Sequence, residues 1–216
     1  MPQPRHHPSD DVLMAYAAGS LPAPFALVVA THLALCPACR AETRRHEAVG
    51  GILLDELAPA TVSEEAKSRV MARLDEPVPE PPVPTPDRRG GEVLPRPLRD
   101  LVGGPLKARL WRFAGGFSYV PLPSPRGFRI RLLSIRPGFG APKHTHEGSE
   151  MALVLAGGFK DGGRQFLRGD VAEADSSIDH RQIADPGEPC LCLAVTEGRL
   201  HLTGPLGRLI DPLLRL

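Results

Sequence analysis

Residues 138–157 read GFGAPKHTHEGSEMALVLAG, in which two histidines and a glutamate precede an apolar run. Side chains of a β-strand alternate between its two faces, so His144 and His146 point the same way if this segment is extended. Glu150 has the same parity and can join them inside a barrel. Imidazole and carboxylate are common metal ligands, so the stretch predicts three ligands that share one interior.

Further strand-like segments lie on both sides of this stretch, separated by glycine-rich breaks. They are residues 128–135, 151–156, 191–195 and 200–203. Many short strands at this spacing favour an all-β sandwich or barrel. A fourth metal ligand is expected from a strand across the barrel, and His180 is the candidate.

A proline-rich segment divides the chain. Residues 76–97 read EPVPEPPVPTPDRRGGEVLPRP, and eight of them are proline. This composition favours an extended linker with polyproline II character. The sequence therefore predicts a helical unit at 1–75, a linker at 76–97 and a β unit at 98–216.

The helical unit is expected to hold four short helices. Ser9 can cap the first, Pro22 or Pro24 can open the second, and the third runs from Pro37. The fourth begins at Thr61, three residues before a glutamate, as in a capping box. About 75 residues in short helices bury only a marginal core, so an additional stabilising link is expected.

A metal ion can supply that link. His32, Cys36 and Cys39 form His-x3-Cys-x2-Cys, with the histidine ending one helix and the cysteines opening the next. A helix N-terminus favours thiolate, the form that binds metal. Zinc prefers four tetrahedral ligands, and the residues alone leave His6 and His7 as alternatives for the fourth. A thioredoxin-like redox motif would need a βαβ pattern, which is absent from the sequence. We interpret His46 as a solvated or partner-facing residue.

The stretch HHPSDDVLMAYAAGSLPAPFALVVATHLALCPACR, residues 6–40, resembles the start of the ChrR-type zinc-binding anti-sigma factors. In that family the N-terminal ligand lies 25 residues before the helical histidine. Counting back from His32 therefore selects His7 over His6. The resemblance implies that this domain clamps a group IV (extracytoplasmic-function) sigma factor. It also implies that the first helix and the helix at 62–74 supply part of the contact surface.

The β unit resembles a cupin. Gly138-x5-His144-x-His146-x3-Glu150-x6-Gly157 matches the first cupin motif at every specified position. The second motif is recognisable only from the spacing between Gly169 and His180. Where that motif usually has proline, glycine and asparagine, this chain has Asp175, Ser177 and Ala184. The expected fold is multidomain α + β, a small helical bundle held together by zinc and followed by an all-β cupin barrel.

Three imidazoles and one carboxylate suit zinc, manganese, iron or nickel, and the resemblance favours zinc, giving one zinc ion per domain. Cys190 and Cys192, two residues apart in PCLCLAV, share a strand face. They are interpreted as small buried hydrophobes, with an oxidant-sensitive pair as the alternative.

The resemblance implies an anti-sigma factor that releases its sigma factor on an oxidative signal, of the singlet-oxygen or peroxide type, sensed by the cupin. It implies no enzymatic activity. The alternative is a metal-dependent cupin enzyme, dioxygenase-like, with a regulatory helical domain.

Composition excludes other classes of function. The net charge is +1, so there is no electrostatic case for direct nucleic-acid binding. No run approaches the ~18 apolar residues of a membrane span. No secretory signal is recognisable, and the cysteines form two close pairs that indicate metal or redox chemistry. We therefore expect a cytoplasmic protein for which homo-oligomers are not required.

Overall fold

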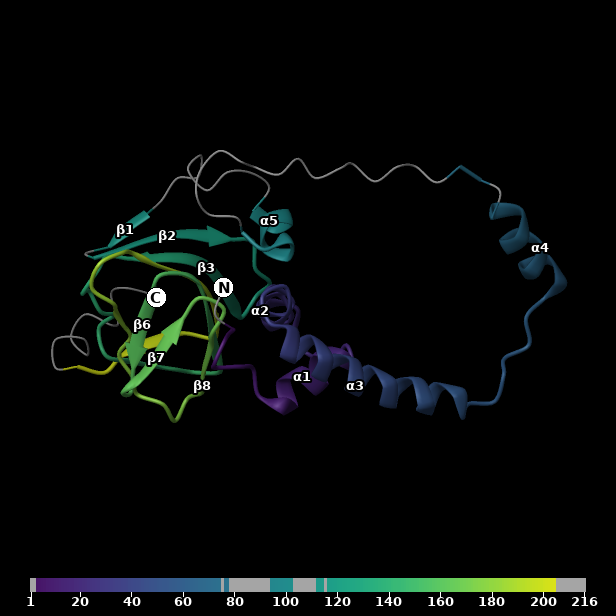
Figure 1. The fold of residues 1–216 in the computed structure, drawn as a ribbon, viewed down its shortest axis with the longest axis horizontal. Coiled ribbons are helices and arrows are strands. Elements are labelled where there is room, and N and C mark those ends of the chain that lie inside the picture. Colours follow the sequence, from purple (N-terminus) through teal and green to yellow (C-terminus); the bar gives the residue numbers. More distant parts are fainter. Residues whose placement is uncertain (1–2, 75, 78–93, 103–111, 115, 205–216) are drawn as a thin grey trace.

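The computed structural model describes residues 3–74, 76–77, 94–102, 112–114 and 116–204 (Figure 1). Five helices are present in these ranges. They are α1 (Asp10–Ala17), α2 (Ala23–Leu33), α3 (Pro37–Asp55), α4 (Glu64–Arg73) and α5 (Arg96–Val102). The first four confirm the expected helices, and α3 continues through Gly50 and Gly51 without a break.

The start of α4 differs from the expected capping box at Thr61. Ser63 is the N-cap, and its side chain accepts a hydrogen bond from the backbone N–H of Ala66 at 3.2 Å. Thr61 and Ser63 both carry the hydroxyl group that an N-cap needs, so the sequence allowed the helix to begin at either one. The hydrogen bond to Ala66 shows that it begins after Ser63.

The β part contains eleven strands among the described residues. They are β1 (Arg112–Ala114), β2 (Phe117–Leu122), β3 (Phe128–Ile135), β4 (His144–His146), β5 (Glu150–Ala156), β6 (Gly158–Asp161), β7 (Arg164–Leu167), β8 (Val171–Ala174), β9 (Ile183–Ala184), β10 (Cys190–Glu197) and β11 (Leu200–Leu202). All named strand pairs are antiparallel.

The strands form three hydrogen-bonded sheets. A six-stranded sheet has the order β1-β2-β3-β10-β5-β8, and the others are β7-β6-β9 and β11-β4. Isolated bridges join Gly140 to Ile183 and His144 to His180. The class of fold, helices followed by a β-rich part, is confirmed. The expected closed barrel is corrected, because in the part of the chain described here the three sheets do not close into one ladder.

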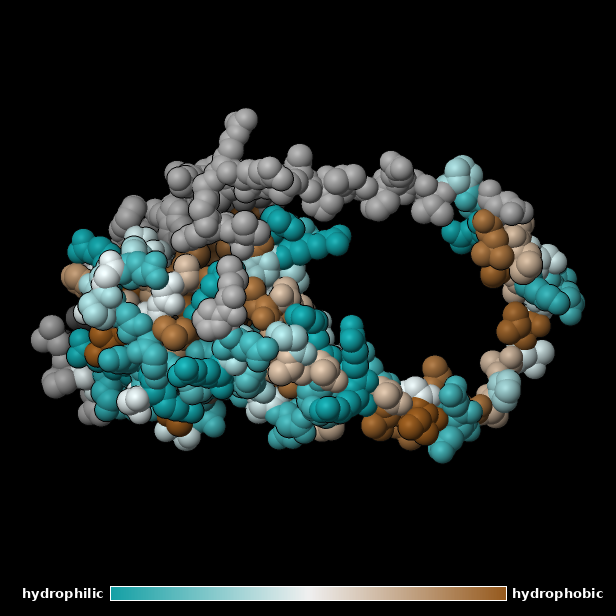
Figure 2. All heavy atoms as spheres, viewed as in Figure 1, coloured by the Kyte–Doolittle hydropathy of each residue, from teal (hydrophilic) through white to brown (hydrophobic). Residues whose placement is uncertain are grey.

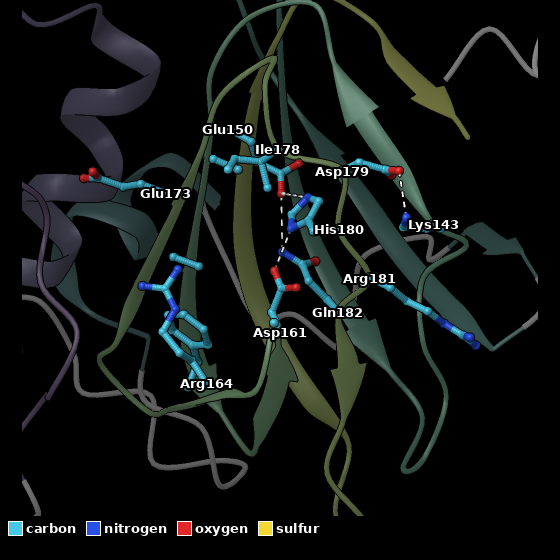
Figure 3. Close-up of a pocket in the computed structure, with 14 residues that line it drawn as sticks. Lys143, Glu150, Asp161, Arg164, Glu173, Ile178, Asp179, His180, Arg181 and Gln182 are labelled. Carbon is cyan, nitrogen blue, oxygen red and sulfur yellow. Dashed lines mark hydrogen bonds and ion pairs between the residues drawn. The ribbon is translucent and has the colours of Figure 1, made fainter. Parts of the chain in front are cut away.

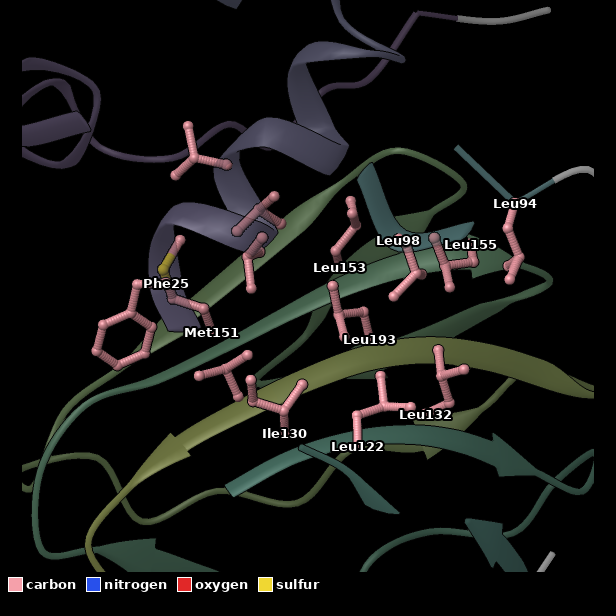
Figure 4. Packing of buried hydrophobic residues seen from close by; sticks show 14 of the residues in the cluster. Phe25, Leu94, Leu98, Leu122, Ile130, Leu132, Met151, Leu153, Leu155 and Leu193 are labelled. Carbon is pink, nitrogen blue, oxygen red and sulfur yellow. The ribbon is translucent and has the colours of Figure 1, made fainter. Parts of the chain in front are cut away.

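The helical part packs directly on the six-stranded sheet. Val28 and Val29 of α2 are fully buried in one hydrophobic core with Leu153 of β5 and Leu193 of β10 (Figure 4). Leu98 of α5 belongs to the same core. The helices therefore cover one face of the sheet, and the two parts share a core.

This packing explains the continuous apolar runs of β5 and β10. On β5, Met151, Leu153 and Leu155 face the helices, whereas Val154 belongs to a second cluster on the other face. Strands buried on both faces lose the alternation of polar and apolar residues. The helical part thus takes the place that solvent would have on a half-exposed sheet.

Most of the expected linker, residues 78–93, lies outside the described residues. Its last residues are structured: Leu94 is buried, and α5 begins at Arg96, before the predicted boundary at 98. Searching the described helices for one long and apolar enough to cross a membrane finds none.

Candidate metal centres

The helical part brings four potential ligands together. His7 lies in the arm before α1, His32 in the last turn of α2, Cys36 at the N-cap of α3 and Cys39 in its first turn. Their ligand atoms all lie within 4.8 Å of one another. His7 Nδ1 is 3.3 Å from Cys39 Sγ and 3.5 Å from Cys36 Sγ.

The ring of His32 is oriented by a backbone carbonyl. Its Nδ1 is 2.8 Å from the carbonyl oxygen of Gly169, and because a carbonyl only accepts, Nδ1 must carry the proton and donate. Nε2 therefore carries the lone pair, and it is buried without a hydrogen-bond partner among the described residues. Burial lowers the pKa of His32 to about 4, which keeps the ring neutral near pH 7. A neutral imidazole with an unpartnered lone pair is a metal ligand in the required state.

The two thiols indicate the same need for a cation. Both are buried and free, and burial together with the neighbouring Cys36 raises the pKa of Cys39 to about 12. A divalent cation would offset this cost by stabilising both thiolates. Two imidazoles and two thiolates form a donor set that suits tetrahedral zinc.

The neighbouring histidines have other contacts. The ring centroid of His6 lies 4.5 Å from that of Phe166 in β7, so the structure brings His7 and not His6 to the cysteines. His46 Nε2 is 3.0 Å from Asp10 Oδ1, and Glu42 completes a partly exposed group of three.

The second group of four lies in the β part. His144 and His146 come from β4, Glu150 opens β5, and His180 follows the turn after β8. Their ligand atoms also lie within 4.8 Å of one another, and all four residues are buried. His146 Nε2 is 3.1 Å from Glu150 Oε2 and 3.4 Å from His180 Nε2.

Hydrogen bonds also fix two of these rings. His144 Nδ1 donates to the carbonyl oxygen of Pro142 at 2.8 Å, and His180 Nδ1 lies 2.6 Å from Asp161 Oδ2 (Figure 3). Each contact directs the Nδ1 proton outward and leaves Nε2 for the interior. The Nε2 atoms of His180 and His146 then face each other, an arrangement that a shared cation stabilises.

Charge balance keeps the carboxylate ionised. Burial alone would raise the pKa of Glu150, but the hydrogen bond from His146 and the nearby imidazoles hold it below its usual value. Burial lowers the pKa of His144. For His180, burial is outweighed by Asp161 and Glu150, and the pKa is raised. The set therefore combines one anionic carboxylate with three imidazoles, which bind a cation in their neutral form.

Three supporting residues were not predicted from the sequence. Besides Asp161, Thr196 Oγ1 lies 3.3 Å from Glu150 Oε2 and Gln182 Nε2 lies 3.4 Å from Glu150 Oε1. A signal for Thr196 existed, because it has the parity of Cys190 and Cys192 along β10.

Cys190 and Cys192 share one strand face, as their parity predicted, and they belong to the second cluster, on the sheet face away from the helices, which we call the inner cluster. Cys190 and Cys192 are buried with Phe159 and Phe166, and their Sγ atoms are 3.4 Å apart. The hydrogen bond with Cys190, together with burial, raises the pKa of Cys192 well above its ordinary value. Cys192 is therefore held as a neutral thiol.

The β site is open to small molecules. A cavity of about 400 Å³ is lined by Glu150 and His180 together with Asp161, Arg164 and Gln182 (Figure 3). A small reactive molecule can therefore reach the ligand group from solvent.

Comparisons with known proteins support one family. The anti-sigma-E factor ChrR of Cereibacter sphaeroides is 43% identical over 213 residues, which cover 98% of this chain and 99% of that protein. A chain in the crystal structure of Rhodobacter sphaeroides SigE in complex with the anti-sigma ChrR is 42% identical, with a TM-score of 0.77, over 90% of this chain and 100% of that chain. A protein with a cupin-like fold from Ralstonia eutropha is 19% identical, with a TM-score of 0.37, over 43% of this chain and 61% of that chain. No family model matches the chain.

Proposed function

We propose that this chain, which belongs to the ChrR family of anti-sigma factors, sequesters a group IV sigma factor through its N-terminal helices. The related chain was solved in complex with SigE, which supports a sigma factor as the partner. Because sigma factors act on RNA polymerase, we infer that the chain works in the cytoplasm. Its family makes it a regulator, so the alternative of a cupin enzyme is not retained.

The observation that carries this proposal is a group of exposed apolar side chains on the second half of α3, on α4 and on the residues next to these helices. We call it the apolar arm, defined by its residues Val49, Ile52, Leu53, Leu54, Leu57, Val62, Val70, Met71 and Leu74, each between 57% and 69% exposed. Figure 2 shows these apolar groups along the extended segment that ends in α4. Many large apolar side chains exposed on one segment mark a protein interaction site.

The state of α4 supports the same conclusion. It buries no residue of its own and stands away from the other helices and the sheets (Figure 1). A ten-residue helix without tertiary packing is marginal in water, so a partner is needed to stabilise it. Laying the apolar face of a helix into a groove of another protein is a common recognition mode.

We further propose that each group of four ligands holds one zinc ion, and that the β site senses the signal for release. The sites would use His7, His32, Cys36 and Cys39 in the helical part, and His144, His146, Glu150 and His180 in the β part. Zinc supplies charge balance and cross-linking in the first site. The cavity beside the second site supports access by an oxidant of the singlet-oxygen or peroxide type, and imidazole and thiol side chains are oxidisable.

The test of the function is binding and inhibition. The full chain, mixed with a group IV sigma factor such as Rhodobacter sphaeroides SigE, is expected to elute as a one-to-one complex in size-exclusion chromatography. Added to RNA polymerase with that sigma factor, it is expected to suppress transcription from a sigma-dependent promoter. A chain that neither binds group IV sigma factors nor suppresses transcription would refute the proposal.

Replacing His144 and His146 with alanine is expected to separate sensing from binding. Both side chains are buried in the β site, away from the apolar arm. The variant should therefore bind the sigma factor within about 0.5 kcal/mol of the unmodified chain, the usual range for an uncoupled change. Its release of the sigma factor under photosensitised singlet oxygen should fall to the rate measured in the dark.

The matched control is His201→Ala, a histidine on β11 next to β4 that contacts Glu147 at the surface. It should bind and release as the unmodified chain does. Loss of sigma binding in the His144 and His146 variant would show that the division of roles between the two parts is wrong.

A further inference from the structure

A turn of the β part reaches into the helical metal site. It runs from Leu167 to Val171, between β7 and β8. The carbonyl oxygen of Gly169 in this turn accepts the hydrogen bond from His32 Nδ1. A Cβ built on Gly169 would lie 2.7 Å from Pro4 Cγ, so the N-terminal arm passes directly against the turn.

Asp170 holds this arm with its carboxylate. Oδ1 accepts hydrogen bonds from the backbone N–H groups of Arg5 at 2.6 Å and His6 at 3.0 Å. The arm is also held from the opposite direction, because the N–H of Val171 donates to the carbonyl oxygen of His6 at 3.0 Å. His7, a candidate metal ligand, is the next residue.

Burial and a further hydrogen bond fix the carboxylate of Asp170 in this position. Asp170 is only 2% exposed, and its Oδ2 accepts a hydrogen bond from the N–H of Leu167 at 2.8 Å. Burying a carboxylate is costly unless such donors satisfy it. One buried side chain thus connects the turn of the β part with the arm that carries His7.

The contact also acts electrostatically on the site. Asp170 and the hydrogen bond to Gly169 oppose the effect of burial on the pKa of His32. A negative charge at this position is favourable for a cation among the four ligands.

We propose that Asp170 is a positioning residue for the helical metal site. It holds the N-terminal arm, the segment before α1, so that His7 stays against Cys36 and Cys39. The inference rests on the proposed metal in that site. The β part then supplies the outer shell of the metal site in the part that binds the sigma factor. A displacement of this turn would loosen the site directly, without passing through residues 76–97.

Cobalt binding by the full chain tests this role. Thiolate ligands give Co²⁺ a charge-transfer band that only a cysteine site can produce, so the band reports the helical site even when the β site is filled. Competition with a chelator then measures the cobalt affinity of that site. Loss of an outer-shell partner costs about 10- to 100-fold in metal affinity. We expect a loss of that size in Asp170→Ala and a smaller loss in Asp170→Asn, whose amide keeps one acceptor oxygen.

The matched control is Asp185→Asn. Asp185 accepts a hydrogen bond from Gln165 Nε2 at 2.7 Å, a contact within the β part, and its variant should keep the cobalt affinity of the unmodified chain. If the Asp170 variants bind cobalt as tightly as the unmodified chain, the assigned role is overturned and the metal site itself is not. An unmodified chain without the charge-transfer band would overturn the metal site and this role together.

Near-ultraviolet circular dichroism monitors the fold of each variant. If Asp170→Ala loses the native signal, the cobalt affinity of Asp170→Asn is used to test the role instead. If both variants lose it, Asp170 stabilises the β part as a whole, and the assigned role is wrong.

Discussion

The chain with Cys36 and Cys39 both replaced by alanine is expected to lose the metal of its helical part and, with it, the sigma factor. Two of the four ligands disappear, leaving His7 and His32 without a closed site. Zinc in small structural sites contributes about 10–16 kcal/mol of apparent binding free energy, as much as the entire stability of many domains. We expect sigma affinity to fall by at least about 100-fold, which corresponds to about 2.7 kcal/mol. Isothermal titration calorimetry measures this loss.

The matched control replaces Cys190 and Cys192 with alanine. These cysteines are equally buried but lie in the inner cluster of the β part, so the variant should keep its sigma affinity. Undiminished binding by the Cys36 and Cys39 variant would show that metal does not hold the sigma-binding helices together.

Charged substitutions on the apolar arm are expected to weaken sigma binding strongly without affecting the fold. Leu53 is 60% exposed and Val70 is 61% exposed. An aspartate at either position would therefore stay in contact with water in the free chain. In the complex each side chain would be desolvated, and central apolar contacts of an interface cost about 2 kcal/mol or more when lost. The double variant Leu53→Asp, Val70→Asp should bind the sigma factor about 100- to 1000-fold more weakly. Its melting temperature should match that of the unmodified chain.

Ala72→Asp is the control on the same helix. Ala72 is exposed and lies two residues from both Val70 and Leu74, so its side chain projects from nearly the opposite side of α4 and adds the charge outside the apolar face. This variant should retain full affinity. Full affinity in the double variant would exclude the apolar arm as the docking surface.

Short-range spacing predicted most of the two groups of potential metal ligands. A two-residue step along β4 places His144 and His146 together, and one helical turn places Cys39 beside Cys36. These are consequences of backbone geometry and need no knowledge of the remaining fold. His180 was predicted from its distance to a glycine, and it joins the group although the residues around it depart from the usual turn.

The choice between His6 and His7 shows where local reasoning ends. The two residues are adjacent and chemically identical, so the pattern alone left both open. In the structure His7 lies at the cysteines, and the N-terminal arm that carries it is hydrogen-bonded to Asp170, more than 160 positions away in the sequence. Asp161 was missed for the same reason, because no periodicity connects it with His180.

The packing of the helices on the sheet was only partly visible in the sequence. The unbroken apolar runs MALVLA and CLCLAV predict strands covered on both faces, but they do not say by what. The cover proves to be α2 and α5, the latter beginning within the expected linker. An apolar face specifies that it must be buried, whereas its partner depends on the tertiary fold.

Native mass spectrometry of the chain purified together with a group IV sigma factor measures partner and metal at once. We predict a single complex whose mass equals one copy of each protein plus two zinc ions. Substitution of Cys36 and Cys39 should remove the complex, and substitution of His144 and His146 should remove one zinc ion only. A metal-free complex of the unmodified chain, or a folded chain that carries two zinc ions and forms no complex, would contradict this interpretation.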